Sequence, residues 1–182
     1  MEPVTDKYSR LRPIINNGDI ILVRGKSLLA RALQWGDHAY FNHALVVFKV
    51  GDRLLCIQSM AQGVIPAFLS TELLANIDFT ILRPQFSQER IDECVNEAFT
   101  KSENGIPYNT FQLLNILIQR KLGFDVKQLG NSKDNICSVF AGITYGGALP
   151  LTCYSYTVTG QDYLTPQDFI KFLNPSEIKI IG

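Results

Sequence analysis

The chain has 182 residues, of which 46% are hydrophobic and 19% charged, and its 17 basic and 17 acidic residues leave no net charge. This length suits a single domain that spans residues 1–182 and buries a substantial core. The neutral balance, and the lack of any cluster of lysines and arginines interleaved with aromatic residues, argue against nucleic acid or an anionic membrane surface as a partner.

Hydropathy and cysteine usage narrow the class of protein further. The apolar runs stay far below the ~20 residues that a transmembrane helix needs, so we expect no transmembrane segment. The first residues also lack the basic and apolar regions of a signal peptide. The four cysteines are widely and irregularly spaced, which predicts neither a disulfide framework nor a zinc site. We therefore expect a cytoplasmic protein, and the sequence leaves its oligomeric state open.

The first half of the chain predicts mainly strands. After the first of these, a short helix takes Ser27 as its N-cap and Gly36 as the residue after its last turn. Gly51 and Asp52 then separate two apolar, β-branched runs, which is a strong hairpin signal. In chain order, the predicted elements are a strand over 19–24, the helix over 27–36, hairpin strands over 43–50 and 53–60, and a strand over 78–83 that ends at Pro84.

The second half predicts mainly helices, so the fold class is α+β: a meander of strands with helices before and after it. A helix from Ser87 has its apolar residues at helical spacing, and Cys94 is among them, which predicts a structural role for this thiol. Thr165 and Pro166 open the last helix, with the proline at N1. The other predicted elements are a helix after Tyr108 that ends at Gly123, a loop over 125–134, a helix from Cys137 to Gly146, and strands over 151–159 and 177–181.

Cys137 stands at the predicted start of its helix, in the run Asn135-Ile-Cys137-Ser-Val-Phe-Ala. Asp134 or Asn135 is a suitable N-cap, and the apolar residues that follow supply a buried face. Unpaired amide N–H groups and the positive end of the helix dipole favour a thiolate at such a position, which would make the sulfur a nucleophile. The alternative is that Cys137 is a small buried hydrophobic residue.

The predicted hairpin places a histidine beside a glutamine. With a two-residue loop, Gln58 falls opposite Leu45. His43 falls opposite Met60, and alternation puts it on the same face as Gln58, as a diagonal neighbour. Backbone atoms at diagonal positions lie about 7–8 Å apart, within reach of a long amide side chain. A three-residue loop would slip the register and bring Ser59 to that face instead.

This pairing suits a cysteine hydrolase. Such an enzyme needs an imidazole that takes the thiol proton and later gives it to the leaving group, and a third group that fixes the orientation and tautomer of the ring. The carbonyl oxygen of Gln58 can accept a hydrogen bond from one ring N–H of His43, which would direct the other ring nitrogen at Cys137. The alternative for His43 is a core histidine whose ring has a partner in an apolar strand.

Two other patterns resemble a phosphate-binding loop and a metal site, but each lacks residues that such a site needs. Gly25-Lys26-Ser27 lies between a strand and a helix, as the end of a phosphate-binding loop would, but that motif needs a glycine at position 20, which is isoleucine. His38 and His43 lack further metal ligands at a useful spacing. The sequence therefore predicts no metal site and no bound cofactor.

Six short motifs occur in an order that resembles one known family. In this order and spacing they resemble the circularly permuted, YiiX/YebB-like branch of the NlpC superfamily of papain-like cysteine hydrolases, over residues 18–173. The histidine precedes the cysteine, as in that permuted group, which also resembles lecithin:retinol acyltransferases. The motifs are Gly18-Asp19-Ile-Ile-Leu-Val, Asn42-His43-Ala-Leu-Val-Val, Ile57-Gln58-Ser with Gly63-Val64 downstream, Gly105-Ile-Pro-Tyr108-Asn, Cys137-Ser-Val-Phe and Thr165-Pro-Gln-Asp168.

The resemblance implies a papain-like fold in which a small, barrel-like antiparallel sheet packs against helices. It implies Cys137 as the nucleophile, His43 as the base and Gln58 as the orienting residue. Tyr108 matches a tyrosine of this branch that lines the site or polarises the substrate carbonyl; the alternative is a tyrosine packed before a helix. Many relatives carry Glu at the position of Gln58 and an acidic residue at that of Val139, so the substrate cannot be copied from them.

The sequence supports three interpretations of function. The first is a thiol-dependent amidase or peptidase that acts on an amide or ester through a thioester, with a lipid acyltransferase or thioesterase as a variant of the same chemistry. Its candidate substrates are cell-wall-type peptides, other amidated small molecules and lipid acyl esters. The second is a non-catalytic module that holds a peptide or lipid, and the third is a structural protein in which Cys137 is buried.

Overall fold

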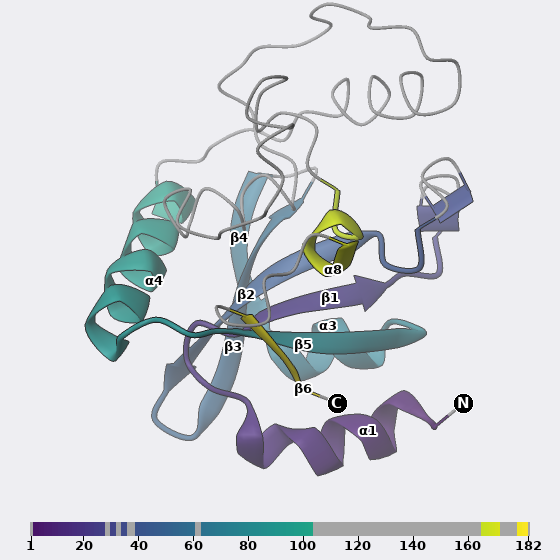
Figure 1. Cartoon of the computed structure of the whole chain (residues 1–182), viewed down its shortest axis with the longest axis horizontal. Helices are drawn as coiled ribbons and strands as arrows, with labels where there is room; N and C mark the ends of the chain where they lie inside the picture. The colour runs from purple at the N-terminus through teal and green to yellow at the C-terminus, as the bar shows by residue number, and fades with distance from the viewer. Residues whose placement is uncertain are drawn as a thin grey trace, which may run out of the picture.

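A six-stranded antiparallel sheet organises the chain in the computed structural model, which describes residues 2–27, 30–31, 34–35, 39–60, 63–103, 165–171 and 178–181. The strands lie in the order β4-β3-β2-β1-β5-β6 (Figure 1). They are β1 (Ile20–Arg24), β2 (His43–Val50), β3 (Arg53–Met60), β4 (Gly63–Phe68), β5 (Asp78–Pro84) and β6 (Ile178–Ile181). The helices are α1 (Val4–Leu11), the 3-10 helix η1 (Arg12–Ile14), α3 (Leu69–Leu74), α4 (Gln88–Glu103) and α8 (Asp168–Lys171).

The β2–β3 hairpin has the register predicted from its two-residue turn. Val50 pairs with Arg53, and the ladder extends to Val46 opposite Ile57. Gly51 has a φ of 58°, a left-handed conformation that glycine adopts without strain. Because side chains alternate along each strand, this register fixes which residues of β2 and β3 share a face.

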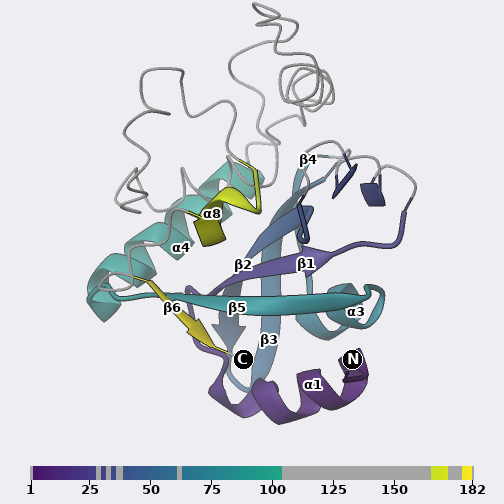
Figure 2. The same cartoon turned by 45° about the vertical axis from the view of Figure 1, so that its right-hand side comes forward.

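Helices cover both faces of the sheet. α4 and α8 lie against one face, and α1 and α3 lie against the other (Figure 2). Alternation along β2 divides the core in the same way, because Val46 and Phe48 pack in the cluster under α4, whereas Leu45 and Val47 pack in the cluster above α1. The central strands are therefore apolar on both sides, which explains their nearly continuous apolar sequence.

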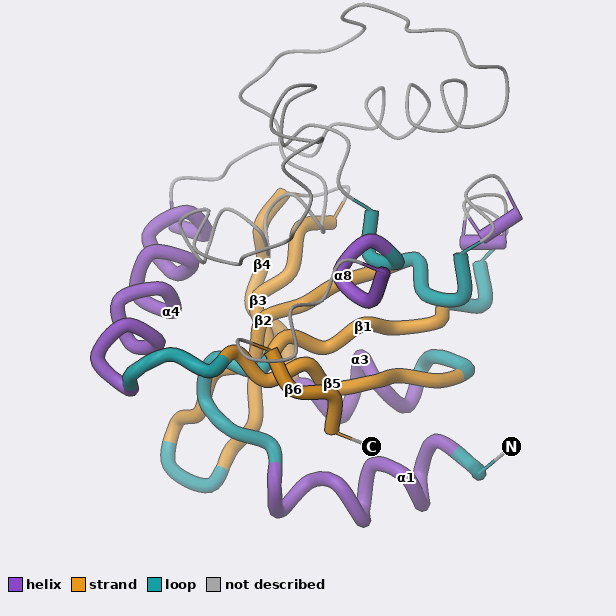
Figure 3. The backbone as a smooth tube through the Cα atoms, viewed as in Figure 1, coloured by secondary structure: helices purple, strands orange, loops and turns teal. Residues whose placement is uncertain are grey.

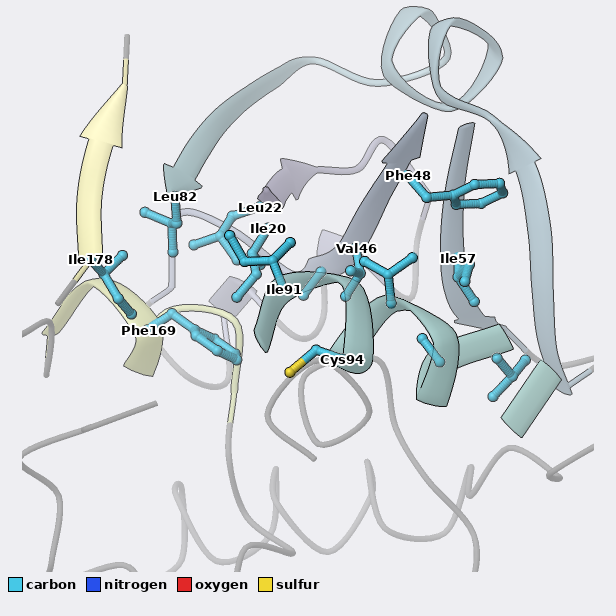
Figure 4. Packing of buried hydrophobic residues seen from close by; sticks show 14 of the residues in the cluster. Ile20, Leu22, Val46, Phe48, Ile57, Leu82, Ile91, Cys94, Phe169 and Ile178 are labelled. Atoms are coloured by element: carbon cyan, nitrogen blue, oxygen red, sulfur yellow. The ribbon is translucent and has the colours of Figure 1, made fainter. Parts of the chain in front are cut away.

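The cluster under α4 also fastens the C-terminal part of the chain to the sheet. Phe169 of α8 is fully buried, and Ile178 of β6 is 1% exposed. Both lie beside Leu82 of β5 at one end of this cluster (Figure 4). Cys94 of α4 is also 1% exposed and packs in the same cluster, so its predicted structural role is confirmed. The last described segments thus belong to the same core as the hairpin.

The predicted α+β class is confirmed, but the described sheet is open and not barrel-like. Figure 3 shows the strands fanning out, with β4 and β6 at opposite edges. Within the described ranges, each of these two strands has one neighbour. Pro66 in the middle of β4 lacks an N–H, and β6 has only four residues. Both features limit pairing at a sheet edge.

The predicted strands of the described ranges are confirmed, and β5 runs one residue further than expected, to include Pro84. The predicted helix cap Ser27 is present, and Ser87, near which a helix was predicted to start, is a second cap. Ser27 Oγ accepts a hydrogen bond from the Ala30 N–H at 3.0 Å, and Ser87 Oγ accepts one from the Arg90 N–H at 3.3 Å. Their side chains satisfy amide groups that a helix start leaves unpaired.

The start of the last helix was predicted too early. α8 begins at Asp168, so Pro166 is not at N1 but lies in the turn before the helix. The Gln167 carbonyl accepts from the Ile170 N–H at 3.1 Å, three residues on, which is a tight turn leading into the helix.

Some predictions cannot be compared, and some elements were not predicted. α1, β4 and α3 were missed. The predicted helices after Tyr108 and from Cys137, the end of the first helix at Gly36 and the strand over 151–159 lie outside the described residues. In the part of the chain that is described, no helix combines the length and apolarity needed to cross a bilayer.

An ion pair between a half-buried arginine and a buried carboxylate ties the turn before β1 to the end of β5. Asp19 is 1% exposed, and Arg83 donates to its two carboxylate oxygens through Nε and Nη2, each at 2.8 Å. The Asn16 N–H donates to the same carboxylate at 2.7 Å, and Arg83 also donates to the Ile14 carbonyl. The hydrogen bond to Asp19 raises the pKa of Arg83. A two-pronged contact of this kind fixes position as well as charge.

Replacing Arg83 should therefore be costly. Arg83→Met would leave the Asp19 carboxylate buried and uncompensated, and we expect the free energy of unfolding to fall by about 3 kcal/mol. Urea unfolding measures this loss. Arg90→Met is the matched control, because Arg90 forms only an exposed pair with Glu93, 2.9 Å away, and its removal should cause no measurable change. Equal effects of the two substitutions would contradict the role given to the buried pair.

Candidate functional site

The two residues that sequence analysis placed side by side are hydrogen-bonded to each other. His43 Nε2 lies 2.7 Å from Gln58 Oε1. His43 is the first residue of β2 and is half-buried, whereas Gln58 in β3 is 1% exposed. A buried amide needs partners for its polar atoms, and the imidazole supplies one of them. The predicted contact between the two side chains is confirmed.

This hydrogen bond fixes the tautomer of the neutral histidine. An amide oxygen only accepts hydrogen bonds, so Nε2 of His43 must be the donor and must carry the proton. Nδ1 is then the ring nitrogen that lacks a proton and can act as a base. Gln58 oxygen also holds the ring in one orientation, as the third member of a catalytic triad does.

Asn42, the residue directly before His43, is bonded to the C-terminal end of β1 and to the segment that follows it. Its backbone N–H donates to the Val23 carbonyl at 3.1 Å. Its Oδ1 accepts from the Gly25 N–H at 2.7 Å and from Gln34 Nε2 at 2.9 Å. A Cβ added at Gly25 would lie 3.2 Å from Asn42 Nδ2, so the close approach of the two segments favours glycine. The start of β2 is therefore held by the segment that follows β1.

Tyr40 is held from two further directions. Its hydroxyl donates to Asp78 Oδ2 at 2.9 Å, and Lys7 Nζ donates to Asp78 Oδ1 at the same distance. The guanidinium carbon of Arg24 lies 4.4 Å from the centroid of the Tyr40 ring, in a cation–π arrangement. Burial by itself would raise the pKa of Asp78, but hydrogen bonds from Lys7, Tyr40 and a backbone N–H outweigh it and lower that pKa.

The described cysteines are buried and unreactive in character. Cys56 is fully buried in β3, and its burial raises the pKa of the thiol to about 12. Cys94 lies on the buried side of α4. A thiolate is the reactive form of cysteine, so neither residue has the environment of a nucleophile.

The other candidate residues cannot be placed. Cys137, Tyr108 and His38 lie outside the described residues, so their distances to His43 and Gln58 are not defined. Among the residues that are described, no group of three or more His, Cys, Asp or Glu side chains could hold a metal ion. Of the predicted catalytic set, the base and the orienting residue are therefore brought together, and the nucleophile is left as a prediction.

Comparison with known proteins identifies the fold. No family model and no curated protein matches the chain. Among solved structures, the crystal structure of the metalloprotein YiiX from Escherichia coli O157:H7 is similar, with a TM-score of 0.55 and 14% sequence identity. The match covers 92% of this chain and 96% of YiiX. The chain thus has a YiiX-like fold, as the order of its sequence motifs predicted.

The lowered pKa of Asp78 predicts a pH-dependent contribution to stability. A carboxylate whose folded pKa lies below its ordinary value of 3.8 stabilises the fold above that pH and loses this contribution as the pH falls through the folded value. The stability difference between the wild type and Asp78→Asn should be full near neutral pH and vanish at the acid end. Urea unfolding over a pH series measures it. In a Lys7→Met background the difference should shrink, and a difference independent of pH would contradict the assignment.

The burial of Cys56 predicts that this thiol resists alkylation. With a pKa of about 12 and no exposed surface, Cys56 should stay unlabelled by iodoacetamide in the folded protein near neutral pH. It should be labelled rapidly in urea. Peptide mapping by mass spectrometry distinguishes it from the other three cysteines. Labelling of folded protein at the rate of a free exposed thiol would show that the strand opens readily.

Proposed function

We propose that the chain is a thiol-dependent hydrolase of the amidase or peptidase type. Cys137 is the nucleophile, His43 the general base and Gln58 the orienting residue. The observation that carries the proposal is the 2.7 Å hydrogen bond from His43 Nε2 to Gln58 Oε1, which prepares Nδ1 to receive a proton. The YiiX-like fold and the order of the motifs support the same assignment, because the resemblance gives each of the three residues this role.

In the proposed reaction, His43 Nδ1 takes the proton of the Cys137 thiol. The thiolate then attacks the substrate carbonyl carbon, and the carbonyl π electrons move to the oxygen. The backbone N–H of Cys137 stabilises this oxyanion, and Tyr108 is a further candidate for that role. Collapse of the intermediate breaks the bond to the amine or alcohol, which leaves with the proton from Nδ1. Water, deprotonated by His43, then hydrolyses the thioester and frees the thiol.

In the proposed site the residue that orients the histidine, Gln58, is an uncharged amide and not a carboxylate. The amide oxygen stabilises an imidazolium ring less than a carboxylate would, because it carries no full charge. It still fixes the tautomer, and a thiolate beside the ring supplies the negative charge that an imidazolium needs.

We propose a mechanism that uses no metal, although YiiX is described as a metalloprotein. In this chain Nε2 of His43 carries a proton toward Gln58, and the lone pair of Nδ1 is assigned to the proton of the Cys137 thiol.

The substrate class follows from the chemistry of the nucleophile. We propose a small peptide, another amide or a lipid acyl ester in a cytoplasmic setting, with cell-wall-type peptides as first candidates. If an alcohol or amine intercepts the thioester in place of water, the same residues perform acyl transfer. A catalytically weak module that binds a peptide or lipid is the alternative from a different class, and it predicts an ordinary thiol at Cys137.

The pH profile of iodoacetamide alkylation at Cys137 tests the proposal. A thiol paired with an imidazole reacts well below the unperturbed cysteine pKa of about 8.5. We therefore expect Cys137 to be labelled at about pH 6 at least 10-fold faster than a model thiol. His43→Ala should abolish this excess while the protein stays folded, and Gln58→Leu should reduce it.

Cys56 and Cys94 are internal controls in the same experiment, because both are buried and should remain unlabelled. A screen of acyl probes with mass detection of a Cys137 adduct then identifies the substrate class. Ordinary reactivity at Cys137, unchanged by His43→Ala, would refute the enzymatic proposal.

A further inference from the structure

A side chain from the C-terminal part of the chain is bonded to the segment that leads into β2. Gln167 Oε1 accepts hydrogen bonds from the Tyr40 N–H at 2.8 Å and from the Phe41 N–H at 3.3 Å. Gln167 is 127 residues from Tyr40 in sequence. Only Asn42 separates these two peptide groups from His43. One amide oxygen therefore holds two consecutive N–H groups just before the proposed catalytic base.

Apolar packing fixes the place of this oxygen. Gln167 directly precedes α8, and its carbonyl accepts from the Ile170 N–H at 3.1 Å. Phe169 of α8 is fully buried, Phe41 is 7% exposed, and both belong to the cluster under α4. Because the residues on each side of the contact are anchored in one core, little conformational freedom remains to be lost when the hydrogen bonds form.

The Gln167 oxygen accepts from backbone N–H groups that have no partner in the β1–β2 ladder. β1 pairs with β2 only from Val23 opposite His43 onward, and the Asn42 N–H already donates to the Val23 carbonyl. The Tyr40 and Phe41 N–H groups precede this ladder. Phe41 is buried, and an unpaired peptide group is costly when it is removed from water, so its N–H requires another partner. Asn42 holds one side of the segment through the Gly25 N–H, and Gln167 holds the other.

We propose that Gln167 is a positioning residue for His43. By holding residues 40–41, it prevents the chain from pivoting about Asn42, so that the His43 ring stays in hydrogen-bonding distance of Gln58 and keeps its proton on Nε2. The role in catalysis rests on the proposed function, but the effect on the imidazole does not. A second anchor of the base is useful because misplacement of a catalytic group by about 1 Å can lower a rate by orders of magnitude.

The test uses two substitutions that differ in one property. Gln167→Met keeps the length of the side chain but removes the acceptor, whereas Gln167→Glu keeps an acceptor. The first measurement is the tautomer ratio of His43, obtained by ¹⁵N NMR in a Cys137→Ala background, where no thiolate can hold the ring as an imidazolium, and at a pH above the titration of the ring in the same spectra. The chain has two histidines, so His43→Gln assigns the signals. The second reading is the alkylation rate of Cys137 at about pH 6.

We expect the wild type and Gln167→Glu to hold the Nε2–H tautomer. Gln167→Met should show a mixture of tautomers and a fall in the Cys137 alkylation rate on the order of 10-fold. Gln85→Met is the matched control: Gln85 is exposed, its amide donates to the Arg83 carbonyl at 3.2 Å, and its loss should leave both readings unchanged. If Gln167→Met is too unstable to measure, Gln167→Ser, which is too short to reach the two N–H groups, takes its place.

The outcomes separate the two proposals. A wild-type tautomer ratio in Gln167→Met, or an equal loss in Gln167→Met and Gln167→Glu, would overturn the positioning role. If Cys137 of the wild type shows no excess reactivity, the proposed hydrolase function fails, and the tautomer ratio alone still decides whether Gln167 positions His43.

Discussion

The pairing of β2 with β3 decides whether His43 and Gln58, on which the proposed function depends, can meet at all. Gly51 and Asp52 close the hairpin with a two-residue turn, and this turn sets the register of the ladder. A slip by one residue would carry every side chain of one strand to the opposite face of the sheet. Gln58 would then leave the face of His43, and the hydrogen bond between them could not form. The same slip would exchange the residues of β3 between the two core clusters, so the packing on each face of the sheet also favours the arrangement that the site requires.

The site lies at one end of this hairpin, where the regular ladder gives way to bonds from side chains. Asn42 connects the start of β2 to the segment after β1, and Tyr40 connects it to Asp78 and Lys7. Gln167 adds a bond from the C-terminal part of the chain. In the interior of the sheet, backbone pairing and core packing hold each residue. At its end, where the proposed base must face a substrate, acceptors from distant segments replace the missing strand partners.

The hairpin, β1, β5, α4 and the contact between His43 and Gln58 could be predicted because each depends on local patterns: turn residues, alternation and caps. α1 was missed although Val4, Tyr8 and Leu11 follow a helical spacing, because most of its other residues are polar. β4 was missed because Pro66 interrupts its apolar run, and an edge strand tolerates such a residue. The predicted barrel-like shape is wrong for the described sheet for another reason: closure is set by whether the two edges of a sheet meet, and no local pattern encodes that distance.

The proposed base and its orienting partner differ from the rest of the proposed site in how they are assembled. His43 and Gln58 are 15 residues apart and joined by a tight turn, so their contact forms when the hairpin forms, at a small cost in chain entropy. The contact between Gln167 and Tyr40 spans 127 residues and requires the C-terminal segment to dock on the core. The hairpin that brings the two residues side by side is therefore decided locally, whereas the orientation of the ring and its hydrogen bond to Gln58 depend on the whole fold. A chain built in this way can form the hairpin in a destabilised variant and still lose the alignment that chemistry at a thiol demands.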